Sequence, residues 1–85
     1  MKFKLNKYMF DLLKENVPDA LEYVIEVQGE DQINFVIKDS DVSEVKLLIN
    51  DEIVLHGMDN QDTVNDLGLR LYKLYDDILY QKNNQ

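Results

Sequence analysis

Several residue types are scarce or missing from this chain of 85 residues, and each absence excludes a kind of chemistry. Cysteine is absent, which excludes a disulfide, a thiolate nucleophile and a thiolate metal site. The single histidine, His56, would have to combine with carboxylates to hold zinc, which is unusual, so we interpret it as a surface residue at a strand end. The three glycines stand far apart and cannot form a phosphate-binding loop.

Long apolar runs are also missing. No segment approaches the ~18 consecutive apolar residues that a membrane span needs. Near the N-terminus, Lys7, Asp11 and Lys14 interrupt the apolar residues and no small-residue cleavage site follows, so we predict no signal peptide. We expect a cytoplasmic protein without a membrane contact. The composition, 45% hydrophobic and 31% charged, predicts one globular domain over residues 1–82, followed by a frayed tail at 83–85.

Positive charge is scarce beyond the N-terminal segment. The chain has 9 basic and 17 acidic residues and a net charge of −8. Residues 1–14 contain four lysines and one acid, a net charge of +3, whereas residues 15–85 contain five basic residues and sixteen acids, a net charge of −11. A protein that binds nucleic acid directly carries the opposite sign on its working face, so we expect no direct DNA or RNA binding.

Two helices are predicted from apolar residues with a helical period. Asn6 can cap a helix that runs to about Asn16 and ends before Pro18. A second helix is predicted from near Asp62 to about Gln81, with Asn60, Asp62 or Thr63 as its cap. Its expected core stripe consists of Val64, Leu67, Leu71, Leu74, Tyr75 and Ile78.

Alternating apolar and polar residues predict four strands between the helices, at 21–28, 33–38, 45–49 and 53–56. The Asn50-Asp51 pair can form a hairpin turn, since both residues tolerate positive φ. The segment from Ser43 to Leu48 could also start a helix, but its β-branched residues favour the hairpin. The predicted fold is a two-layer α+β domain: a helix, a four-stranded antiparallel meander and a helix, with both helices on one face of the sheet.

The two faces of this predicted sheet differ in character. The inner face is expected to hold Leu21, Tyr23, Ile25, Val27, Ile33, Phe35, Ile37, Val45, Leu47, Ile49, Ile53 and Leu55. On the other face, Val24, Val36, Leu48 and Val54 would form an apolar band, either as ordinary surface residues or as a dimer or partner surface. On the last helix, Leu69 and Tyr80 lie off the core stripe and Tyr72 lies at its margin. They either meet the first helix and a loop or form a second contact surface.

Catalytic and metal-binding patterns are incomplete. Asp39-x-Asp41-x-Ser43 has the first ligand spacings of an EF-hand loop, but Glu44 stands where glycine is required and Asn50 where the bidentate glutamate is required. The serine and threonine hydroxyls, at Ser40, Ser43 and Thr63, lie in no nucleophile motif. We therefore predict a protein that is not an enzyme and has no cofactor or metal.

The acidity favours a small protein-binding regulator, with inhibition by nucleic-acid mimicry on a basic, nucleic-acid-handling protein as one form of it. The single alanine and single arginine, Ala20 and Arg70, indicate an AT-rich genome, and in size and charge the chain resembles small acidic inhibitors carried by phages of bacterial hosts. The alternative is a self-associating, homodimeric structural or adaptor module that uses the second sheet face. The candidate acidic contact residues are Glu22, Glu26, Asp39, Asp41, Glu44, Asp51, Glu52, Asp59, Asp62, Asp66, Asp76 and Asp77.

Overall fold

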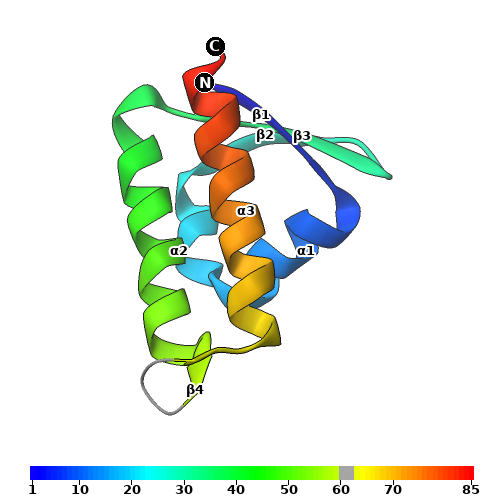
Figure 1. Cartoon of the computed structure of the whole chain (residues 1–85). Helices are drawn as coiled ribbons and strands as arrows, with labels where there is room; N and C mark the ends of the chain where they lie inside the picture. The colour runs from blue at the N-terminus through cyan, green and yellow to red at the C-terminus, as the bar shows by residue number, and fades with distance from the viewer. Residues whose placement is uncertain (60–62) are drawn as a thin grey trace.

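The computed structural model describes residues 1–59 and 63–85, and these form an α+β fold (Figure 1). Its sheet has three antiparallel strands in the order β1-β3-β2, and a separate two-stranded ribbon pairs β4 with β5. The three strands of the sheet are β1 (Lys2–Asn6), β2 (Val24–Gln28) and β3 (Gln32–Ile37). The predicted α+β class is confirmed, whereas the predicted four-stranded meander is wrong.

The first strand, β1, was not predicted. Lys2, Phe3, Lys4 and Leu5 alternate between exposed and buried, the pattern of a strand with one face on the core. Phe3 lies opposite Phe35 of β3, and their rings stack with centroids 5.8 Å apart. β1 therefore supplies the sheet edge that the sequence analysis assigned to later segments.

Helix α1 (Lys7–Asn16) confirms the first predicted helix and its cap. The Asn6 side chain accepts a hydrogen bond from the Met9 backbone N–H at 2.8 Å. Pro18 then begins a 3₁₀ helix, η1 (Pro18–Tyr23), because its fixed φ and missing N–H suit a first helical turn. The strand expected from residue 21 therefore starts only at Val24.

The β2–β3 hairpin is predicted correctly in its second strand and incorrectly in part of its first. Ile33 and the other inward residues of β3 are buried. In β2 the register shifts at Glu26, which adopts a φ of 53°. This bulge turns the strand, and Ile25 and Val27 are exposed instead of lying in the predicted inner face.

The predicted hairpin at 45–49 and 53–56 is wrong, because residues Val42–His56 form one helix, α2. Val42, Val45, Ile49 and Ile53 recur at helical spacing and are all buried. Together with Leu47 and Leu55, three of these residues also fit the alternation of a strand, so the sequence is compatible with both a helical period and a strand period. Burial of the helical stripe overrides the β preference of the valines and isoleucines.

Helix α3 (Asp66–Asn83) follows α2 through the short strands β4 (Met58–Asp59) and β5 (Thr63–Val64). Its cap is Asn65, whose side chain accepts a hydrogen bond from the Gly68 N–H at 2.8 Å. The start predicted near Asp62 was too early: Thr63 lies in β5, and the other expected caps, Asn60 and Asp62, lie outside the described residues.

The two long helices, α2 and α3, run antiparallel and meet through two glycines (Figure 1). A Cβ added to Gly68 would lie 2.1 Å from the Gly57 carbonyl oxygen. That oxygen also accepts a hydrogen bond from the Asn65 N–H at 2.9 Å. The predicted α3 stripe is confirmed at its centre, where Leu71, Leu74 and Ile78 are buried.

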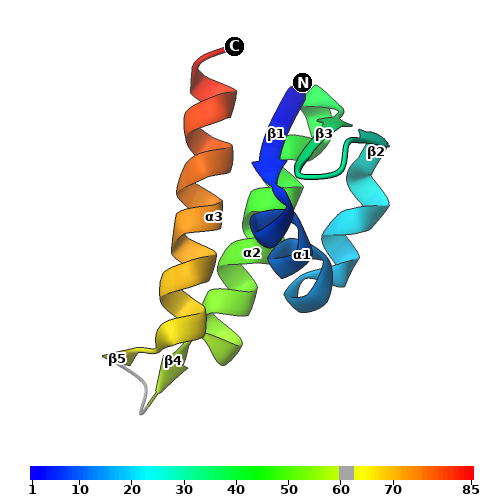
Figure 2. The same cartoon turned by 90° about the vertical axis from the view of Figure 1, so that its right-hand side faces the viewer.

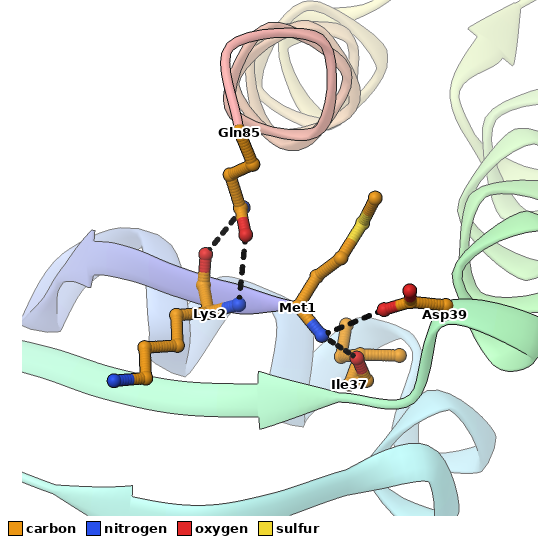
Figure 3. A network of polar contacts seen from close by, with 5 residues as sticks. All are labelled: Met1, Lys2, Ile37, Asp39 and Gln85. Atoms are coloured by element: carbon orange, nitrogen blue, oxygen red, sulfur yellow. Dashed lines mark hydrogen bonds and ion pairs between the residues drawn. The ribbon is translucent and has the colours of Figure 1, made fainter.

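The end of α3 lies along the outer edge of β1 (Figure 2). The Gln81 side chain accepts from the Lys4 N–H at 2.8 Å and donates to the Lys4 carbonyl at 2.7 Å. Gln85 makes the same pair of bonds with Lys2 (Figure 3). We call Gln81 and Gln85 the glutamine clasp. It satisfies backbone groups that an edge strand otherwise leaves unpaired.

The N-terminal amino group is held at the other side of β1. It donates to the Ile37 carbonyl at 2.7 Å and forms an ion pair with Asp39 at 3.1 Å (Figure 3). The lysines of β1 and Asn34 of β3 lie on the open face of the sheet and are exposed, whereas Phe10 of α1 packs against Phe35 on the inner face. Of the helices in residues 1–59 and 63–85, none combines the length and the apolar character that crossing a membrane requires.

Candidate protein-binding face

The structure separates the predicted acidic contact residues into two groups. Five of them lie on or beside η1 and α2: Glu22, Asp41, Glu44, Asp51 and Glu52. The others are dispersed: Glu26 on β2, Asp39 beside the N-terminus, Asp59 on β4, and Asp66, Asp76 and Asp77 on α3; Asp62 lies outside the described residues. Three of the dispersed carboxylates have structural partners: Asp39 pairs with the N-terminal amino group at 3.1 Å, Asp59 accepts from Asn65 at 3.2 Å and Asp77 accepts from Gln81 at 2.9 Å.

Four carboxylates act electrostatically on Tyr23 at the end of η1. Partial burial and then the negative charges of Glu44, Glu22, Asp41 and Asp19 raise the pKa of the Tyr23 phenol above its ordinary value of 10.0. The carboxylates come from η1, from η2 (Asp39–Asp41) and from the first turn of α2. The close packing of η1 against α2 therefore concentrates negative charge that is spread over 26 positions of the sequence.

A groove of about 240 Å³ continues from this acidic cluster between η1 and α2. Leu48 and Leu55 of α2 line one wall, and Val17 and Pro18 line the other. The remaining lining residues are polar or acidic: Asn16, Asp19, Asp51 and Glu52. None of the residues that line the groove is lysine or arginine.

We define the acidic face as Asp19, Glu22, Asp41, Glu44, Asp51 and Glu52, together with this groove. Asp19 belongs to both parts, because it lines the groove and also acts on Tyr23. Both walls of the groove therefore combine apolar side chains with carboxylates. Such a surface is suited to a basic partner that also has apolar side chains, because charge complementarity and apolar burial act at the same place.

The predicted apolar band is not a feature of the sheet. Val24 and Val36 are half-buried on β2 and β3, whereas Leu48 and Val54 lie on α2, because the segment that was expected to give two strands is a helix. The three residues predicted on the last helix, Leu69, Tyr72 and Tyr80, are exposed on α3. None of these three residues lines the groove, which Leu48 does.

Some residues of this face were missed by sequence reasoning. Asp19 was not singled out, Val17 and Pro18 were interpreted only as the end of the first helix, and Tyr23 and Leu55 were assigned to the inner face of the predicted sheet. The available signal was the distribution of apolar residues around the whole of segment 42–56. A surface helix normally keeps one face polar, so a helix that does not is expected to contact something on both sides.

His56 is the last residue of α2 and is exposed; its Nδ1 lies 2.7 Å from a carboxylate oxygen of Glu52. Within residues 1–59 and 63–85, no three or more histidine, aspartate or glutamate side chains are arranged to hold a metal ion. Comparisons with protein-family models, curated proteins and solved structures gave no match for this chain.

Proposed function

We propose that this protein is a non-enzymatic regulator that binds another protein through the acidic face. The observation that carries the proposal is the continuity between the four carboxylates around Tyr23 and the apolar groove beside them. Carboxylates held on helices attract a basic surface over several ångströms, and the apolar groove adds contact area that is less sensitive to salt. Basic surfaces of this kind are common on nucleic-acid-handling proteins, which are the partner class that the charge favours.

The experiment is a capture assay with two variants of equal net charge. Glu22→Lys combined with Asp51→Lys reverses two carboxylates of the acidic face. Glu26→Lys combined with Asp76→Lys reverses one glutamate and one aspartate that are exposed elsewhere, on β2 and α3. Each protein is immobilised, exposed to a nuclease-treated bacterial lysate and eluted with a salt gradient, and circular dichroism establishes that each variant is folded.

We expect the unmodified protein and the control variant to retain the same basic protein and to release it at moderate salt. The acidic-face variant should retain at least about tenfold less, since it places two positive charges against a positive surface. Equal loss in both variants would mean that only the net charge matters and would refute the proposal. Full retention by the acidic-face variant would refute it as well.

A further inference from the structure

Helix α2 has an outer surface that is unusually apolar for a helix at the surface of a small protein. Val42, Val45, Ile49 and Ile53 already fill its inward stripe. On the outer surface, Leu47 is 51% exposed, Val54 58% and Leu55 70%. These side chains lie on two sides of α2: Leu47 lines a hollow with Tyr75 of α3, whereas Leu55, the most exposed of the three, lines the groove beside η1. An apolar side chain left in water at the edge of a groove is suited to contact with another molecule.

Two leucines of α2 line the groove and are separated by about two helical turns. Leu48 and Leu55 both line it and lie seven residues apart on α2, which is about two helical turns or ~10.5 Å. Asp51 and Glu52 lie between them on the same wall, and Asp19 lies on the opposite wall. An occupant therefore needs two apolar side chains about two turns apart, flanked by positive charges.

The backbone chemistry of the groove favours a helix as occupant. Both walls are helical, so their main-chain groups are largely bonded within η1 and α2 and offer no strand edge to an extended peptide. An extended occupant would lose hydration of its N–H and C=O groups without finding partners for them. A helix satisfies its own backbone and presents apolar residues at positions i and i+7 with the spacing of Leu48 and Leu55.

Charge argues against a second copy of this chain in the groove. The protein carries a net charge of −8, and three carboxylates line the groove itself. A copy seated through the same surface would bring like charges together, which is unfavourable in a partly desolvated contact. A cationic occupant is attracted by the same groups.

We propose that the groove between η1 and α2 binds a basic amphipathic helix of a partner protein. Two apolar side chains of that helix contact Leu48 and Leu55, and its lysine or arginine side chains face Asp19, Asp51 and Glu52. This inference rests on the proposed function and specifies the part of the partner that is recognised.

The test uses defined peptides and the full chain. The probe is an 18-residue peptide with leucines at i, i+3, i+7 and i+10 and lysines on the adjacent faces. One control peptide has the same composition in scrambled order, and another carries a central proline that interrupts the helix. Binding to isotope-labelled protein is followed by NMR, which gives both the affinity and the residues affected.

Leu55→Asp separates the groove from general charge attraction. This variant adds a carboxylate, so attraction by charge alone would tighten binding, whereas loss of an apolar contact in the groove would weaken it by about tenfold. Leu55 is so exposed that its replacement should leave the fold intact. The matched control is Leu69→Asp on α3, where a leucine that is 54% exposed receives the same change.

The expected result is binding of the amphipathic peptide with shifts at Leu48, Asp51 and Leu55, loss with Leu55→Asp and no loss with Leu69→Asp. Equal binding of the scrambled or proline peptide, unchanged binding to Leu55→Asp, or weakening by Leu69→Asp would overturn the inference. Groove shifts that depend on protein concentration without peptide would also overturn it, since a second copy would then be the occupant. If the peptide fails while the capture assay still depends on Glu22 and Asp51, the proposed function stands and only the helical occupant is wrong.

Discussion

The contact between Gly57 and Gly68 predicts that Gly68→Ala destabilises the protein. From helix propensity alone, alanine in the first turns of α3 would stabilise the helix by about 1 kcal/mol relative to glycine. In the structure the new Cβ would lie 2.1 Å from the Gly57 carbonyl oxygen and 2.7 Å from a methyl carbon of Val64. The oxygen belongs to the backbone, so relief requires α2 and α3 to separate by about 1 Å, from 2.1 Å to the 3.0 Å below which Cβ contacts essentially never occur.

The magnitude follows from these opposing terms. Overpacking of this kind costs about 1–3 kcal/mol, and a clash against backbone belongs at the upper end of that range. After subtraction of the gain in helix propensity, we expect a net loss of about 2 kcal/mol in the free energy of unfolding. For a domain of this size the midpoint of thermal unfolding should then fall by roughly 8–16 °C.

Thermal and urea unfolding followed by circular dichroism measure this effect. Lys73→Ala, on the exposed side of α3, is the control and should change stability by less than about 0.5 kcal/mol. Gly57→Ala should also destabilise, since its Cβ would lie 2.8 Å from the Gly68 Cα. The double variant should lose less than the sum of the two losses, because one separation of the helices relieves both clashes. A Gly68→Ala protein that is more stable than the unmodified chain would refute the close crossing of α2 and α3.

Three other predictions test separate parts of the structure. Replacing both Gln81 and Gln85 by alanine should cost about 1–2 kcal/mol, because the clasp bonds are exposed, and should accelerate exchange of the Lys2 and Lys4 amide protons, measured by NMR. The phenol of Tyr23, whose pKa is raised by partial burial and neighbouring carboxylates, should titrate above the ordinary value of 10.0 in ring-labelled NMR spectra. Since the folded state then keeps a proton that the unfolded state loses near pH 10, stability should decrease as the pH rises above about 10. Gly29→Ala should destabilise by at least about 1 kcal/mol in urea unfolding, because Gly29 has a φ of 111° and an added Cβ would meet the Gln32 carbonyl oxygen.

Each of these predictions has a control and a contrary outcome. Asn83→Ala should leave exchange at β1 unchanged, and unaltered exchange in the double glutamine variant would mean that the clasp does not form in solution. Glu44→Gln should lower the pKa of Tyr23, whereas Asp76→Asn on α3 should not; a Tyr23 titration that ignores Glu44 would argue against the acidic cluster. A Gly29→Ala protein as stable as the unmodified chain would mean that the turn has another conformation.

The sequence predicts those helices and strands whose apolar residues fit only one kind of secondary structure. Helix α1 has a cap, a stripe and a terminating proline, and each of these acts as expected. Strand β3 alternates cleanly, and the centre of α3 follows a helical stripe. Strand β1 also alternates, but it has only five residues and ends at the Asn6 cap, so its pattern is too short to stand apart from the start of α1.

Segment 42–56 was not predictable in the same way, because its apolar residues fit both a helix and two strands. The choice is made by tertiary packing: the helix buries Val42 together with Val45, Ile49 and Ile53, and it leaves exposed Leu47 and Leu55, which the hairpin would have buried. The candidate site could not be predicted as a whole for the same reason. Its carboxylates were identified one by one, but their grouping around Tyr23 depends on α2 being a helix packed on η1.

The glutamine clasp also has a consequence for the order of folding. The β2–β3 hairpin and the α2–α3 pair join neighbouring segments, so little chain entropy opposes their formation. The hydrogen bonds of the clasp instead join distant parts of the chain. Gln81 and Lys4 are separated by 77 positions in the sequence, and Gln85 and Lys2 by 83 positions. We therefore expect the contact between β1 and the end of α3 to form last during folding and to break first during unfolding. A mutation in the clasp should accelerate unfolding and leave the folding rate nearly unchanged.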